Sequence, residues 1–354
     1  MKRKKEGIAT RTKRRLERCC IVLMVSTAIF LVSFFPSYSF AGGAQHYPLG
    51  AEAFLIGIGP PPGFYIKEYN SFYTADKIKN DSGHALSLAK DGFVLDKLNV
   101  YGITTRLVWV SPFKILDGFY AQNLFIPLLN LDMKVTQLGP NGPVKVSEHR
   151  QALGDIRYTP FALLWHSNDG LLHYATSLSI DFPNGPYNER HLVNIGKNCW
   201  TFEPCFIITG FLPQDKNLSA SIHLRYSFNT KNPDFLIDSS TAAKIGNPAL
   251  TGKTTHLTPG QEFHFDYSIE YAIAKTGPAN QARVGIVGYF YQQTTDDTTG
   301  QGSVKNDLGR VFAIGPGVGY TYKKWIFDLH AAYEMGVRNR PEGRTGLFTI
   351  VYAF

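Results

Sequence analysis

Residues 218–229 read Leu218-Ser219-Ala220-Ser221-Ile222-His223-Leu224-Arg225-Tyr226-Ser227-Phe228-Asn229, with apolar and polar side chains in strict alternation. Successive side chains of a strand point to opposite faces, whereas a helix sorts its side chains with a period of 3.6. The stretch therefore predicts a β-strand with one apolar face. Residues 262–271 and 325–335 repeat the pattern, and residues 171–182 show it more weakly.

The same alternation, followed along the chain, predicts an all-β fold of about twelve antiparallel strands. We place them at 63–76, 92–111, 119–135, 154–166, 171–182, 199–211, 217–229, 261–274, 281–294, 308–322, 324–336 and 345–354. Most links after odd-numbered strands are long, notably 77–91, 136–153, 183–198, 230–260 and 295–307, and those after even-numbered strands are short. This asymmetry is typical of a transmembrane β-barrel with periplasmic termini, and a soluble sandwich gives no reason for it.

The last strand gives a second indication. Phe348, Ile350, Tyr352 and Phe354 alternate up to the terminal residue. Outer-membrane barrels typically end on an aromatic residue that the barrel-insertion machinery recognises, so we predict an insertion signal here. A closed barrel also leaves no unpaired backbone in lipid. We therefore expect the protein in the bacterial outer membrane, surrounded by its lipid.

The N-terminus predicts a cleaved signal peptide over residues 1–41. Nine basic side chains occur within the first eighteen residues, an apolar run follows from Cys19 to Phe35, and Ser39-Phe40-Ala41 gives a cleavage site. The alternative is a single transmembrane anchor, for which the run is barely long enough. The chain carries a formal charge of +8, but nine basic and two acidic residues leave with the signal, so the mature protein is close to +1. The composition thus gives no support for nucleic-acid binding.

The polar faces of the predicted strands are expected to line the barrel interior. The charged residues and histidines on these faces either line a water-filled path or pair to form a polar core, and the sequence leaves both open. The candidates are Arg106, Arg157, Asp181, Glu203, His223, Arg225, Glu262, His264, Asp266, Glu270, Arg283, Asp328, His330 and Glu334.

Residues 42–62, before the predicted barrel at 63–354, do not alternate. The segment ends in Gly57-Ile58-Gly59-Pro60-Pro61-Pro62 and contains His46, Tyr47 and Glu52. It is either a periplasmic lead-in or a plug that folds into the bore.

Three glycines lie within one predicted strand, Gly315, Gly317 and Gly319. We interpret them as relief for a bulge or tight curvature.

We expect no cofactor, metal site or catalytic site. The sequence contains neither G-x-S-x-G nor H-E-x-x-H. Cys199 and Cys205 are six residues apart on one predicted strand, about 20 Å at ~3.3 Å per residue. A disulfide requires Cα atoms within roughly 7 Å, so free thiols are predicted.

Several stretches resemble the outer-membrane protein family named for the meta-pathway of phenol degradation. They span nearly all of the mature chain and comprise residues 43–52, 60–65, 194–198, 200–204, 228–232, 260–267, 309–316 and 339–343. Cys199 and Cys205 depart from the aromatic and aliphatic residues expected there. The resemblance implies an outer-membrane barrel that passes small hydrophobic compounds, aromatic ones included, and it implies no enzyme.

The leading hypothesis is therefore a passive channel or facilitator for small apolar molecules. The alternative is a non-transporting surface barrel whose external loops bind a partner. A third, a membrane hydrolase, would need a reactive serine near a histidine on the lipid face, and the clean apolar stripes there argue against it.

Overall fold

A computed structural model describes residues 46–275, 277 and 280–354. The predicted signal peptide at 1–41 and the start of the 42–62 segment lie outside this range. None of the helices in the described part of the chain is long and apolar enough to span a membrane.

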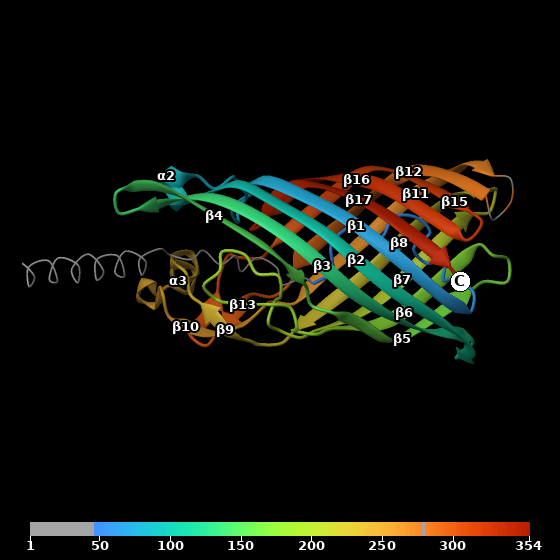
Figure 1. Ribbon diagram of the computed structural model, residues 1–354, viewed down its shortest axis with the longest axis horizontal. Coiled ribbons are helices and arrows are strands. Elements are labelled where there is room, and N and C mark those ends of the chain that lie inside the picture. The colour runs from blue at the N-terminus through green and yellow to red at the C-terminus, as the bar shows by residue number, and fades with distance from the viewer. Residues whose placement is uncertain (1–45, 276, 278–279) are drawn as a thin grey trace, which may run out of the picture. The chain divides into compact units, whose positions relative to one another are not determined.

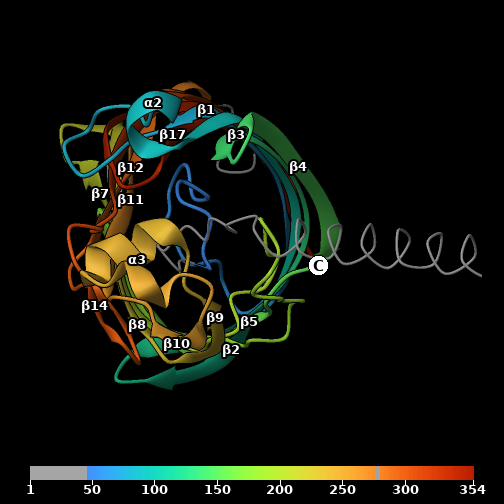
Figure 2. The same ribbon diagram turned by 90° about the vertical axis from the view of Figure 1, so that its left-hand side faces the viewer.

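The twelve predicted strands form a closed antiparallel barrel (Figures 1 and 2). They are β1 (Gly63–Ile78), β2 (Phe93–Ile115), β3 (Gly118–Gly139), β5 (Arg157–His166), β6 (Leu172–Asp181), β7 (Thr201–Leu212), β8 (Asp215–Asn229), β11 (Glu262–Lys275), β12 (Asn280–Gln293), β15 (Arg310–Tyr322), β16 (Trp325–Arg338) and β17 (Pro341–Ala353). The barrel closes where β1 pairs with β17, in the register Tyr65 to Ala353. The predicted fold class is confirmed, and each predicted strand overlaps an observed one, with ends that differ by up to four residues.

The alternation sorts side chains as the sequence predicts. On β8, Ser221, His223 and Arg225 are buried, whereas Phe228 on the opposite face is 44% exposed. On β16, Asp328 and His330 are buried and Leu329 is 54% exposed. The apolar faces thus point away from the barrel axis, toward lipid, and the polar faces point inward.

The long links contain structure that the sequence analysis missed. Residues 142–153 were predicted as part of a loop but form β4 (Gly142–Leu153), which extends β3 into a hairpin. Gly142 has φ +115°, a conformation that suits glycine at this turn. On β4, Val144 and Val146 share a face with Glu148 and Arg150, so no continuous apolar stripe marks the strand.

A small external cap forms from the links 230–260 and 295–307. It is a four-stranded sheet of β9 (Asn232–Leu236), β10 (Thr254–Thr258), β13 (Asp297–Thr299) and β14 (Gly302–Val304), with α3 (Ser239–Ile245) and η1 (Pro248–Leu250). Phe235, Ile237, Ala242, Leu250 and Leu257 form its own buried core. The link 77–91 holds the short helix α2 (Leu88–Asp91).

Candidate functional site

The N-terminal segment, residues 46–62, runs through the barrel interior, where Figure 2 shows it inside the ring of strands. The backbone N–H of Gly50 donates to Asp266 on β11 at 2.9 Å, and that of Leu55 donates to Glu270 on the same strand at 2.9 Å. The N–H of Gly57 donates to Thr209 on β7 at 2.8 Å. The segment therefore crosses the bore and makes hydrogen bonds to strands far apart in sequence.

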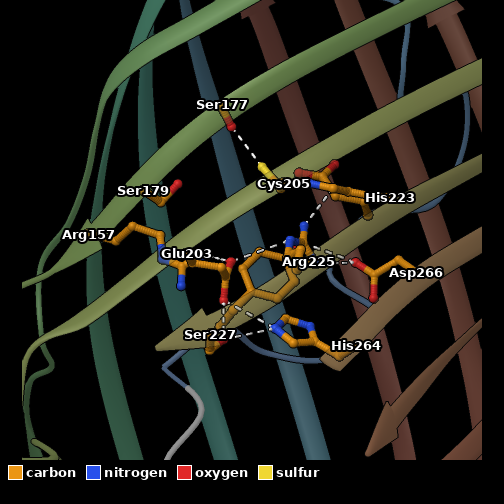
Figure 3. A network of polar contacts seen from close by, with 12 residues as sticks. Arg157, Ser177, Ser179, Glu203, Cys205, His223, Arg225, Ser227, His264 and Asp266 are labelled. Atoms are coloured by element: carbon orange, nitrogen blue, oxygen red, sulfur yellow. Dashed lines mark hydrogen bonds and ion pairs between the residues drawn. The ribbon is translucent and has the colours of Figure 1, made fainter. Parts of the chain in front are cut away.

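A network of charged side chains lies beside the start of this segment (Figure 3). Arg157 on β5 donates two hydrogen bonds to Asp181 on β6, both of 2.8 Å, and one of 2.6 Å to Glu203 on β7. Arg225 on β8 lies 3.1 Å from Asp266 and 3.6 Å from Glu203. Each of these two cations and three carboxylates thus has at least one partner of opposite charge, as expected for ions taken out of water.

Histidines and an aromatic ring complete the network. His264 Nε2 lies 3.1 Å from Glu203, and His223 Nδ1 lies 2.6 Å from Arg225. The Arg225 guanidinium stacks over the Tyr47 ring, 3.5 Å from its centroid, and the Tyr47 hydroxyl donates to Asp266 at 3.3 Å. The N-terminal segment is thus held by the same ions that pair the strands.

His46 and Glu52 make further polar contacts with the barrel wall. His46 Nε2 lies 2.9 Å from Asp155, in the link between β4 and β5. Glu52 lies 2.6 Å from Lys67 on β1 and 3.0 Å from Arg106 on β2. It also accepts a hydrogen bond of 2.8 Å from the Tyr69 hydroxyl. Lys67, Tyr69 and Asp155 were not among the predicted interior residues, although the alternation of residues 63–76 places Lys67 and Tyr69 on one face.

The glycines of β12 and β15 make room for Phe54. A Cβ added to Gly317 would stand 2.8 Å from the Phe54 ring, and one added to Gly285 would stand 2.9 Å from it. At Gly319 the corresponding distance is 3.0 Å. The register between β12 and β15 is continuous here, pairing Arg283 with Gly319 and Gly285 with Gly317. Gly285, Gly317 and Gly319 therefore accept an aromatic ring, and the bulge predicted at residues 315–319 is absent, whereas tight curvature stays a prediction.

The remaining predicted interior residues also lie inside but do not join one cluster. Glu262 accepts from Tyr291 at 2.9 Å, and Glu334 accepts from both Tyr73 and Tyr289 at 2.9 Å. Others contact the N-terminal segment or a neighbouring strand: His330 with Gly50, Glu270 with Ser219 and Leu55, Arg283 with Glu270, and Asp328 with Thr349.

A cavity of about 350 Å³ lies next to the N-terminal segment. Its wall from β2, β3 and β17 is largely apolar, including Leu98, Val100, Leu129, Leu131 and Leu347. Pro48 and Leu49 of the segment also line it, and its polar groups include Glu334, Arg340 and Asp155. Apolar walls with a few polar groups are typical of a small-molecule site, and the volume lies in the usual range.

Both cysteines of the described chain are buried and free. Burial raises the pKa of the Cys199 thiol, in the link before β7, to about 12, which keeps it protonated. The Cys205 sulfur lies 2.7 Å from the Ser177 hydroxyl. Across the described ranges, no three His, Cys, Asp or Glu side chains lie together as metal ligands would.

A closed barrel with an apolar outer face and a polar interior defines a bacterial outer-membrane β-barrel protein. The chain belongs to the family described as "Putative MetA-pathway of phenol degradation", whose model matches residues 75–350. This confirms the family resemblance. No curated protein matches the chain.

The chain is similar to several solved structures at low sequence identity, and the first of these shares its fold. An outer membrane channel from Pseudomonas putida F1 superposes with a TM-score of 0.59 at 16% identity, over 84% of this chain and 97% of that one. The translocator domain of the autotransporter NalP from Neisseria meningitidis gives 0.43 at 9% identity, over 83% and 90% of the two chains. The β domain of the Bordetella autotransporter BrkA gives 0.41 at 11%, over 82% and 99%.

Proposed function

We propose that the barrel takes up small hydrophobic compounds, aromatic ones included, across the outer membrane. The observation that carries this proposal is the cavity of about 350 Å³ with its apolar wall. Small polar solutes would leave that wall in contact with water, whereas an apolar guest removes it from water. A general porin has no need of such a wall.

We further propose that residues 46–62 act as a plug. The segment adds Pro48 and Leu49 to the cavity and continues to Gly57 at β7, so it occupies the bore below the guest. Passage then requires either movement of the segment or an exit beside it. The ion pairs of the interior support this role, because they hold the segment without adding apolar surface to the lower bore.

Conductance separates a plug from a lead-in. The mature protein from Gly42 is refolded into planar bilayers and compared with a chain that lacks residues 42–62. We expect low conductance from the first and a several-fold higher conductance from the second. Equal conductance from two folded proteins would contradict the plug.

Uptake tests the substrate class. The protein is reconstituted into the membrane of vesicles whose outer leaflet is lipopolysaccharide. The rate of toluene entry into these vesicles is compared with the rate of glycerol entry. Leu129→Gln and Val100→Gln make the cavity wall polar and are expected to slow toluene entry at least threefold. Ser71→Ala alters the same wall without adding polarity and serves as the control. Toluene entry no faster than into protein-free vesicles would reject transport and favour a surface barrel whose loops bind a partner.

A further inference from the structure

The strands β15, β16, β17 and β1 lie side by side in the barrel wall (Figure 1). Their outer face is hollowed, and this hollow is called the notch below. Gly346 on β17 pairs with Ala331 on β16 and with Phe72 on β1, and Pro316 of β15 borders the same hollow. A Cβ added to Gly346 would meet no atom within 4 Å. The hollow has a volume of about 610 Å³ and opens on the face that contacts lipid.

Large side chains flank this row of small ones. Phe72 is 47% exposed at one end, and Tyr333, on the next outward row toward the external side, is 62% exposed. Aromatic residues at the ends of the apolar band mark the membrane interface. The notch therefore lies in the external leaflet, with Tyr333 at headgroup height and Phe72 one outward row deeper.

Two cations stand on the external side of the notch. Arg344 pairs in register with Tyr333 on one side and with Thr74 on the other. Thr74 in turn pairs with Asn99 on β2, and Lys97 is the next outward-facing residue of β2 beyond Asn99, toward the external side. Among the described residues that line the hollow, none is acidic. Glu342, the nearest carboxylate along β17, is engaged by Lys77 at 2.8 Å and Lys79 at 3.6 Å. Among the described residues, neither Arg344 nor Lys97 forms an ion pair with a carboxylate, although Asp132 pairs in register with Asn99 and Asp76 follows Ala75, the partner of Leu98.

We propose that this notch binds a phosphorylated glycolipid of the outer leaflet, the lipid A part of lipopolysaccharide. Arg344 and Lys97 hold its phosphates, since a guanidinium forms paired hydrogen bonds with phosphate oxygens. An acyl chain lies over Gly346 and Ala331, against the Phe72 ring. The site lies on the lipid face, so it is independent of the proposed transport through the interior.

The test is native mass spectrometry of the intact mature protein in detergent, with bis-phosphorylated lipid A added. Its dephosphorylated counterpart and phosphatidylglycerol are the comparison lipids. We expect wild-type protein to retain bis-phosphorylated lipid A at least tenfold better than either. The variant R344Q/K97Q should lose this preference, and Gly346→Leu, which fills the notch, should weaken binding of bis-phosphorylated lipid A.

Matched variants separate the site from general surface effects. K145Q/R338Q removes two exposed cations elsewhere, and Gly210→Leu fills a glycine on β7 whose Cβ would also meet no atom within 4 Å. Both should bind like wild type, and heat-modifiable mobility verifies that each variant is folded. Equal retention of all three lipids, or equal losses in the control variants, would overturn the proposal. Retention of phosphatidylglycerol as strong as that of lipid A would overturn the assignment to a glycolipid.

Discussion

At the scale of single residues, the interior is organised by compensation of buried charge. Arg157 and Arg225 each contact two carboxylates, and Glu203 contacts both arginines and His264. Each carboxylate left without its cation would be a buried ion in a poor solvent. The network therefore ties β5, β6, β7, β8 and β11 together, and with them the N-terminal segment through Tyr47.

Replacement of Arg225 tests this compensation. Arg225→Met leaves Asp266 and Glu203 with fewer partners, and we expect the free energy of unfolding to fall by about 3–5 kcal/mol, as for other broken buried pairs. Urea titration in detergent, followed by tryptophan fluorescence, measures the change. Arg338→Met removes an exposed arginine of β16 and should cost little. Similar losses in the two variants would show that the interior pairs do not stabilise the fold.

Asp297 gives the external cap a pH dependence. It accepts hydrogen bonds from the Gly260 N–H at 2.7 Å and from Gln293 at 2.6 Å, yet its burial raises its pKa to about 8. Unfolded aspartate titrates near 3.9, so between about pH 4 and pH 8 the folded cap binds more protons. Its stability should therefore fall as pH rises through this window and then level off.

Hydrogen exchange of the cap strands, corrected for intrinsic rates, measures this effect. We expect protection of β9, β10 and β13 to decline from pH 5 to pH 8 in the wild type. Asp297→Asn keeps the acceptor oxygen without the charge and should flatten the profile. Asp296→Asn, at the neighbouring residue paired with Lys305, is the control. A wild-type profile that stays level across this range would refute the assignment.

At the scale of elements, the proposed transport depends on one segment inside the bore and on one external cap. The N-terminal segment has no regular structure and depends on contacts with the strands. The cap has its own core, and β8 and β11 pair directly beneath it, in the register Ser227 to Glu262. The segment is therefore coupled to the barrel wall residue by residue, whereas the cap is separable from it.

Filling the space that Gly285, Gly317 and Gly319 leave for the Phe54 ring should release the N-terminal segment. Gly317→Val places methyl groups where the Phe54 ring lies, so we expect the ring to move out and single-channel conductance to rise. Gly210→Val, on β7, meets no atom within 4 Å at its Cβ and should leave conductance unchanged. If both variants conduct like wild type, the ring does not hold the segment.

Removing the cap should alter permeability and spare assembly. Replacement of residues 232–258 with a short Gly-Ser linker deletes β9, α3 and β10 but no barrel strand. We expect normal heat-modifiable folding and a changed rate of toluene entry. Unchanged entry of every hydrophobic compound tested would show that the cap does not form the entrance.

At the scale of the whole molecule, closure depends on the pairing of the first and last strands. The Phe354 N–H donates to the Phe64 carbonyl at 3.2 Å, so the chain end is held against the beginning of β1. Both rings point outward, with exposures of 67% and 62%. The terminal residue is thus accessible while the last strand is already in place.

Replacing the terminal aromatic should affect insertion and not stability. Phe354→Ser is expected to slow assembly in cells severalfold, because it removes the proposed recognition signal for the insertion machinery. Pulse-chase labelling with heat-modifiable mobility as the readout measures the rate of assembly. Spontaneous refolding into detergent should proceed as in wild type. Phe64→Ser removes the neighbouring ring and should assemble normally. Equal delays in both variants would attribute the effect to lost apolar surface.

The sequence by itself determined the strands, their facing and the barrel, because a period of two is a local property that every barrel strand repeats. It failed at β4, where Glu148 and Arg150 interrupt the face that carries Val144 and Val146, and at Gly317, whose partner Phe54 is more than two hundred residues away in the chain. Only the tertiary structure decided where residues 46–62 lie, since a segment without periodicity carries no local signal of its position. It also decided which charges pair: Arg225 meets Asp266, and His330 meets Gly50, only after the strands have closed in one register.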